Sequence, residues 1–181
     1  MRIVVSGTHA SGKSTLIADF ARRHRDFAIL PDPFELMDAA PDEPDAGFFL
    51  TQLGVAAARL EELSPDEQAI AERGPLDFLA YLAALDVLGR STRGPELFRR
   101  SAELTARAGS HVDLLVLLPL AADSGIRIPE DEDLELRDAM NDALLELADD
   151  PDLTGGAAIV EMAGDADTRL ALLEEAVAAA V

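Results

Sequence analysis

The chain alternates between short apolar runs and longer amphipathic segments. The short runs are continuous in their apolar character, and turn-forming residues bound them. Such runs are typical of buried strands in a parallel sheet that helices cover on both faces. They predict five strands, at residues 2–5, 27–30, 68–71, 112–118 and 157–162.

The longer segments carry apolar residues at the spacing of an α-helix. They predict helices at residues 13–24, 47–63, 75–88, 95–108, 131–148 and 165–180. Pro75 and Pro95 suit a first helical turn, where the missing amide hydrogen costs nothing, and Asp165 can cap the last helix. Strands that alternate with helices predict an α/β fold with right-handed crossovers.

Two stretches fit neither pattern and are expected to be functional loops. Residues 31–45 contain four prolines, and residues 121–135 include an acidic run after Pro129. Loops of this length within a compact domain usually carry function. Because the chain shows no internal repeat and no linker composition, we expect one domain over residues 1–181.

The charge balance narrows the classes of partner. Asp and Glu number 35 against 15 Lys and Arg, a formal charge of −20, which disfavours nucleic-acid and anionic-membrane partners because both require clustered basic residues. The chain has no cysteine, and no apolar stretch reaches the roughly 18 residues of a membrane span. We therefore expect a cytoplasmic protein. The acidity also fits compositional bias, as does the presence of a single lysine, Lys13.

That lysine belongs to a phosphate-binding motif. Residues 7–14, GTHASGKS, follow the first predicted strand, open the first predicted helix and match the Walker A pattern G-x-x-x-x-G-K-[ST]. The chance of this match around one lysine is about 1 in 3,000 for this composition. Backbone amides of such a loop and the helix N-terminus bind phosphate oxygens. We expect nucleotide contacts from Gly7, Thr8, His9, Ala10, Ser11, Gly12, Lys13, Ser14 and Thr15.

Individual residues of the loop have different expected roles. Lys13 would contact the β- and γ-phosphates of ATP, and the Ser14 hydroxyl would be a ligand of Mg²⁺. His9 would either touch phosphate or face solvent as a spacer. A GTPase needs the motif N-K-x-D, which a chain with one lysine cannot contain, and the transporter-type motif L-S-G-G is absent. An AAA+ motor would carry a strongly apolar strand that ends in Asp-Glu, where this chain has Glu72-Arg73, so small kinases remain.

Five segments carry a family resemblance: GTHASGKSTL, AILPDP, AERGPLDFLAYL, DSGIR and GDADTRL. In this order they resemble the small P-loop kinases of the nucleoside and nucleotide kinase superfamily, in particular the ribosylnicotinamide-kinase-like (NadR-type) AAA-domain family, with deoxynucleoside kinases as more distant relatives. The resemblance implies a five-stranded parallel sheet in the order 2-3-1-4-5. It also implies an acceptor-side segment at about residues 31–66 and a helical lid at about residues 121–137.

Two candidate catalytic positions follow predicted strands. Asp32 comes just after the second strand, where its carboxylate could accept the proton of an acceptor hydroxyl; a turn Asp between prolines is the alternative. Glu72 and Arg73 close the third strand, where Glu72 could hold Mg²⁺ and Arg73 could clamp the acceptor or a phosphoryl oxygen. A purely structural pair is the alternative for these two residues. Asp77 would cap the next helix or orient Arg73.

The predicted lid supplies two further arginines. Arg127 follows Gly125 and could stabilise the charge of the transferring phosphoryl group after lid closure, and Arg137 is a second candidate for that role. Surface arginines that pair with the acidic run at residues 130–135 are the alternative. Both roles require a mobile segment, which the glycine would permit.

The local charge of the acceptor-side segment bears on the substrate. Between residues 31 and 71 only Arg59 is basic, whereas ten residues are acidic. A second phosphate would call for several basic side chains there, so the segment favours a neutral or cationic acceptor. We therefore expect an ATP-dependent, Mg²⁺-requiring kinase that phosphorylates a hydroxyl of a nucleoside-like or other small acceptor.

Two alternatives from other classes stay open. One is a nucleotide-binding regulatory ATPase without an acceptor. The other is a degenerate nucleotide-sensing protein, which the intact Lys13 and Ser14 disfavour. The apolar character of the helices at 47–63 and 75–88 is also compatible with a homodimer formed by a helix pair.

Overall fold

The computed structural model describes residues 1–36, 44–90, 95–120, 129 and 132–180. It contains one parallel sheet with the strand order β2-β3-β1-β4-β5, which confirms the expected topology. In these ranges no helix has both the length and the apolar character needed to cross a membrane. The strands are β1 (Arg2–Ser6), β2 (Ala28–Leu30), β3 (Ala69–Glu72), β4 (Leu114–Leu117) and β5 (Ala158–Glu161).

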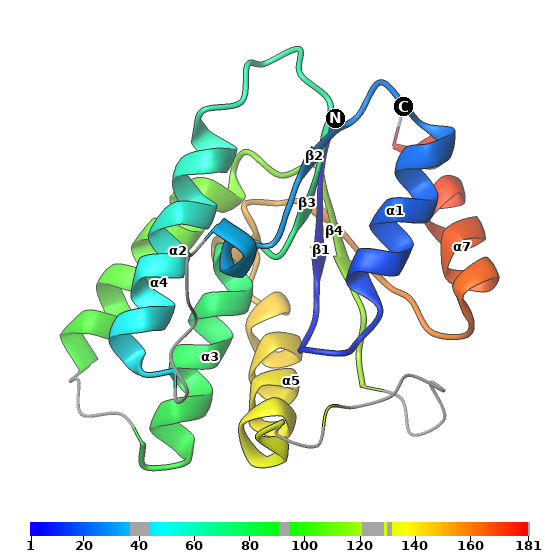
Figure 1. Ribbon diagram of the computed structural model, residues 1–181. Coiled ribbons are helices and arrows are strands. Elements are labelled where there is room, and N and C mark those ends of the chain that lie inside the picture. The colour runs from blue at the N-terminus through cyan, green and yellow to red at the C-terminus, as the bar shows by residue number, and fades with distance from the viewer. Residues whose placement is uncertain (37–43, 91–94, 121–128, 130–131, 181) are drawn as a thin grey trace.

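Helices cover the sheet from both sides (Figure 1). One layer consists of α1 (Lys13–Arg23) and α7 (Ala166–Ala179). The other layer contains α2 (Ala46–Glu61), α3 (Pro75–Val87), α4 (Pro95–Gly109) and α5 (Leu134–Ala148). The expected helices are confirmed to within three residues at each end. Two four-residue elements were not predicted, the 3-10 helix η1 (Pro33–Leu36) and α6 (Pro151–Thr154).

The central strands send alternate side chains into two separate cores. Ile3 and Val5 of β1 pack with α1 and α7, whereas Val4 faces the core formed with α2, α3 and α5. This alternation is the period-2 geometry of a strand, here with both faces apolar because both are covered.

The two edge strands differ from the prediction of buried strands. Ile29 of β2 is 50% exposed and Ile159 of β5 is 41% exposed. Each edge strand has a sheet neighbour on one side only, because β2 pairs with β3 and β5 pairs with β4. An apolar run therefore predicted these strands correctly but not their burial.

The apolar surfaces of α2 and α3 are used inside the chain. Ten residues of α3, from Pro75 to Leu85, are buried, and Phe49 of α2 stacks on Tyr81 of α3 with ring centroids 4.4 Å apart. Core packing thus explains the apolar character that suggested a helix-pair dimer. The homodimer stays a prediction.

All five strands end at the same edge of the sheet. The register pairs Val5 with Glu72 and Ser6 with Leu117, so the segments that follow β1, β3 and β4 begin side by side. In α/β proteins, ligands bind at this carboxyl edge. The loop after β1 and the pair Glu72–Arg73 are therefore brought together here.

Candidate active site

The loop between β1 and α1 has the backbone geometry that its glycines predict. A Cβ on Gly7 would lie 2.7 Å from Ser11 Oγ and 2.9 Å from the Leu118 carbonyl oxygen, so no larger residue fits. Gly12 adopts φ 92°, in the left-handed region that side chains disfavour. The chain then enters α1 at Lys13, which leaves the first amides of this helix free for an anion.

Lys13 lies inside this loop and is 4% exposed. Its Nζ donates a hydrogen bond to the Thr8 carbonyl oxygen at 2.7 Å. Burial, reinforced by the nearby charge of Arg73, lowers the pKa of Lys13 to about 7, although Asp77, Glu72 and Asp32 oppose the shift. The nearby carboxylates do not offset the burial of this ammonium, so a bound phosphate would add the negative charge that stabilises it.

Ser14 and Glu72, the two residues expected to hold a metal ion, are hydrogen-bonded to each other. Ser14 Oγ donates to Glu72 Oε1 at 2.7 Å, and burial raises the pKa of Glu72 above its ordinary value, against the opposing effects of Ser14 and Lys13. A hydroxyl and a carboxylate are oxygen ligands that suit Mg²⁺, which usually keeps several waters and phosphate oxygens besides. No group of three His, Asp or Glu side chains in the described ranges could hold a metal by itself. The pair therefore fits a metal that arrives with a nucleotide.

Asp32 and Arg73 meet across the ends of β2 and β3. Arg73 Nε donates to Asp32 Oδ2 at 2.8 Å, and Arg73 Nη1 donates to the Gly7 carbonyl oxygen at 2.9 Å. The guanidinium carbon lies 5.4 Å from the ring centroid of Phe34 and 5.5 Å from that of Tyr81. Burial disfavours the charge, but Tyr81, Asp32 and Asp77 outweigh it and raise the pKa of Arg73. Arg73 also has φ 63°, a strained conformation for a non-glycine residue.

Asp77 caps the start of α3, which is the first of the two roles expected of it. Its carboxylate accepts hydrogen bonds from the amides of Gly7 and Gly74, each at 2.9 Å, and from Ser6 Oγ at 2.6 Å. It also lies 3.9 Å from Arg73 Nη1. One buried carboxylate thus ties the start of α3 to the beginning of the phosphate-binding loop.

The described part of the predicted lid touches the loop at His9. Arg137 Nε donates to the His9 carbonyl oxygen at 3.1 Å, and the His9 ring is hydrogen-bonded to the Glu132 carboxylate. The His9 side chain is exposed, in agreement with the expectation that it faces solvent, and it also contacts Glu132 on the lid side. Arg127, the first lid candidate, lies outside the described residues, whereas Arg137 lies beside the loop; its proposed role toward the phosphoryl group stays a prediction.

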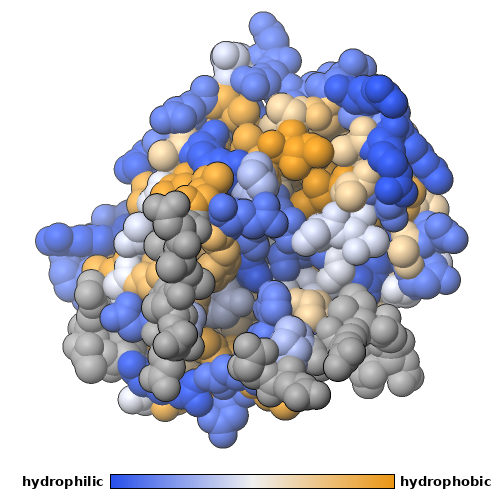
Figure 2. All heavy atoms as spheres, viewed as in Figure 1, coloured by the Kyte–Doolittle hydropathy of each residue, from blue (hydrophilic) through white to orange (hydrophobic). Residues whose placement is uncertain are grey.

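One cavity of about 1350 Å³ connects the phosphate-binding loop with the residues that follow β2 and β3. In Figure 2 hydrophilic side chains line a depression in the middle of the visible face. Residues 9–15 form one part of the wall, and Asp32, Glu72 and Arg73 form the adjoining part. Sequence reasoning did not single out other lining residues, because nothing in the local pattern separates them from ordinary core or surface positions; among them are Phe34, Phe49, Tyr81, Leu85 and Arg90.

The described cavity wall is more acidic than basic. Four basic side chains line it, Lys13, Arg73, Arg90 and Arg137, against six carboxylates, at Asp32, Glu35, Asp45, Glu72, Glu132 and Asp133. Two of the arginines already have carboxylate partners: Arg73 pairs with Asp32, and Arg90 pairs with Asp133 and Glu135. An anionic group bound to either arginine would have to compete with these carboxylates.

A five-stranded parallel sheet in this order, with the Walker A loop after β1, is the fold of the P-loop kinases. No protein-family model matches the chain, and no curated protein matches it significantly. Solved structures, in contrast, do match the chain.

Three solved structures illustrate the likeness. Deoxyadenosine kinase from M. mycoides with bound dATP gives a TM-score of 0.73 at 15% identity, over 98% of this chain and 99% of that one. Thymidylate kinase from Candida albicans gives 0.69 at 17% identity, over 98% and 91%. The NadR protein in complex with NR gives 0.66 at 19% identity, over 97% of this chain and 50% of that chain. At these identities the likeness establishes the fold, so function must be argued from this chain's own residues.

Proposed function

We propose that this protein is an ATP-dependent kinase that transfers the γ-phosphoryl group of ATP to a hydroxyl of a small neutral or cationic acceptor, such as a nucleoside. The observation that carries the proposal is the single cavity that joins the phosphate-binding loop to Asp32 and Arg73. Its volume of about 1350 Å³ exceeds the roughly 300–1,000 Å³ of a site for one small molecule. A regulatory ATPase has no acceptor, so it would need only the part of this cavity that borders the phosphate-binding loop.

The donor side binds and orients the triphosphate. The amides around Gly12 and the N-terminus of α1 receive phosphate oxygens, and Lys13 neutralises the β- and γ-phosphates. Ser14 and Glu72 would hold Mg²⁺, which would supply positive charge to neutralise the phosphates. Because ATP is the donor, the proposal places the protein in the cytoplasm.

The acceptor side orients and deprotonates a hydroxyl. Asp32 accepts hydrogen bonds from Arg73 Nε and, at 3.1 Å, from the amide of Phe34. A carboxylate has about four acceptor positions, so the described residues leave two of them for an incoming hydroxyl. Asp32 would take its proton as the oxygen attacks the γ-phosphorus, while Arg73 orients the carboxylate. Arg137, and Arg127 outside the described residues, would stabilise the charge on the transferring group.

Charge selects the class of acceptor. The structural neighbours include both a deoxyadenosine kinase and a thymidylate kinase, so the shared fold does not distinguish a nucleoside from a nucleotide acceptor. The acidic wall, and the engagement of Arg73 and Arg90 by carboxylates, favour an acceptor without a phosphate. The aromatic rings of Phe34, Phe49 and Tyr81 suit a flat ring as part of that acceptor.

The proposal is tested by measuring ADP release from MgATP with and without acceptors. The panel contains nucleosides, nicotinamide riboside, sugars and amino alcohols, each nucleoside paired with its 5′-monophosphate. We expect at least one unphosphorylated alcohol to stimulate ADP release far more than its phosphorylated partner. Slow hydrolysis that no alcohol stimulates would instead establish the regulatory ATPase, and stimulation by a monophosphate alone would overturn the acceptor class.

A further inference from the structure

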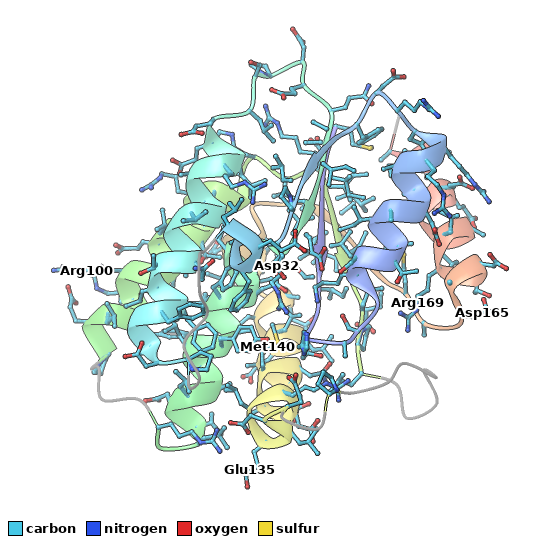
Figure 3. The ribbon with its side chains drawn as sticks, in the orientation of Figure 1. Asp32, Arg100, Glu135, Met140, Asp165 and Arg169 are labelled. Atoms are coloured by element: carbon cyan, nitrogen blue, oxygen red, sulfur yellow. The ribbon has the colours of Figure 1, made fainter. Side chains whose placement is uncertain are left out.

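Arg169 contacts the phosphate-binding loop from the far end of the sequence. It belongs to the first turns of α7, and Figure 3 shows it beside the beginning of α1. Its Nη1 donates to the Ser11 carbonyl oxygen at 2.7 Å, across 158 residues of sequence. The residue is 5% exposed, and its Nε has no hydrogen-bond partner among the described residues. It is absent from the cavity wall described above.

The contact determines which way one peptide group faces. The described peptide bonds include no cis bond, so the carbonyl of Ser11 and the amide of Gly12 point in opposite directions. Arg169 holds that carbonyl outward, toward α7. The Gly12 amide is therefore turned away from Arg169, and Gly12 itself lines the cavity. An amide with this orientation is what a phosphate oxygen requires.

The same device recurs along the loop. Three further carbonyl oxygens of the loop accept a hydrogen bond from a basic side chain: Gly7 from Arg73, His9 from Arg137 and Thr8 from the loop's own Lys13. Each of those three donors lines the cavity and can approach a ligand directly. Arg169 alone among the four does not, so its influence on a ligand has to pass through the Ser11–Gly12 peptide.

Stability alone does not explain a buried guanidinium at this position. The neighbouring residues of α7, Leu170 and Leu173, belong to an apolar core that also contains Met162. A buried cation with an unpaired donor is costly, and an apolar side chain of similar size often replaces it at no loss of stability. We infer that Arg169 is a positioning residue of the nucleotide site, which holds the Gly12 amide in its phosphate-binding orientation. This inference rests on the nucleotide binding proposed above.

The test compares Arg169→Met, Arg169→Lys and Arg100→Met with the unmodified protein. Arg100 is an exposed residue of α4 on the opposite side of the view in Figure 3, so its loss matches the change in charge without touching the loop. The dissociation constants of MgATP and of inorganic tripolyphosphate are measured by calorimetry, and thermal unfolding is followed without ligand. For Arg169→Met we expect both constants to rise by about tenfold or more, the usual effect of losing a charged hydrogen bond.

Further results decide between positioning and structure. Arg169→Lys, which keeps a charged donor, should recover part of the affinity, and Arg100→Met should bind as the unmodified protein does. The Arg169→Met protein should unfold within a few degrees of the unmodified one, and tripolyphosphate should no longer shift its Gly12 amide resonance. Unchanged constants in Arg169→Met would overturn the inference alone. The inference would also be overturned if unfolding of both Arg169 variants accounted for their whole loss of affinity. An unmodified protein that binds neither MgATP nor tripolyphosphate would overturn the proposed function as well.

Discussion

Lys13 is the single lysine of the chain, and its surroundings make it a proton-binding site coupled to nucleotide binding. Burial lowers the pKa of this ammonium to about 7 in the ligand-free protein, and a bound triphosphate supplies the negative charge that raises the pKa again. Nucleotide binding at pH 8 should therefore take up as much as about one proton per ATP. Calorimetric titrations in two buffers of different ionisation enthalpy measure this uptake.

The control for this prediction is Lys13→Arg, because its guanidinium stays protonated at this pH. If this variant binds ATP, it should do so without taking up a proton.

The lowered pKa of Lys13 also predicts how the stability of the protein changes with pH. Between pH 7 and 10.5 the unfolded chain binds more protons at Lys13 than the folded one does, so this residue makes the free energy of unfolding rise with pH across that window. The contribution of Lys13 is the difference in the free energy of unfolding between the unmodified ligand-free protein and Lys13→Arg. A difference that falls between pH 7 and 10.5 would contradict the lowered pKa.

Asp32 is the residue whose chemistry the proposed reaction depends on. Asp32→Asn removes the base but keeps the size of the side chain, so kcat should fall by about 10²- to 10⁴-fold with the affinity for MgATP nearly unchanged. Steady-state kinetics on the acceptor found by the ADP-release experiment measure this. Glu35→Gln is the matched control, because Glu35 is exposed and lines the same cavity three residues later. Turnover of Asp32→Asn within a few-fold of the unmodified protein would show that Asp32 is not the base.

Asp77 connects two elements at this site, because its side chain also caps one of them. Asp77 caps α3 and receives the Gly7 amide and the Ser6 hydroxyl of the β1 segment. Asp77→Ala leaves these buried donors and Arg73 without that partner, so it should lower the free energy of unfolding by about 3 kcal/mol. Asp45→Ala removes an N-cap of α2 and should cost only about 1 kcal/mol. Urea unfolding compares the two, and equal losses would contradict the linking role of Asp77.

The elements themselves were largely predictable from the sequence. Prolines and aspartates mark helix starts, as Pro75 and Asp165 do, and apolar runs mark strands, because both signals act over a few residues. The prediction failed for elements too short to show a period and for burial that depends on the neighbouring strand. Four-residue helices such as η1 carry too few residues for a periodic signal, and the exposure of β2 depends on which strand lies beside it.

The charge of the whole molecule has a cost that can be measured. A formal charge of −20 makes the folded state repel itself, and salt screens this repulsion. Raising NaCl from about 0.02 to about 0.3 M should stabilise the protein by about 1 kcal/mol, or about 2–4 °C in the unfolding midpoint. Replacing the exposed Glu62 and Asp66 by their amides should reduce the salt dependence. A midpoint that falls with salt would show that the surface ion pairs outweigh the repulsion.

The sequence by itself determined the alternation of strands and helices, the phosphate-binding loop and the acidic character of residues 31–71. Each of these is a local property, because hydrophobic period, glycine geometry and charge are set by neighbouring residues. Only the tertiary structure decided which residues meet at the site. Asp32 and Arg73 are 41 residues apart and Ser11 and Arg169 are 158 apart, and no pattern in the chain pairs them. They meet because the sheet order brings the ends of β2, β3 and β1 to one edge and packs α7 against α1.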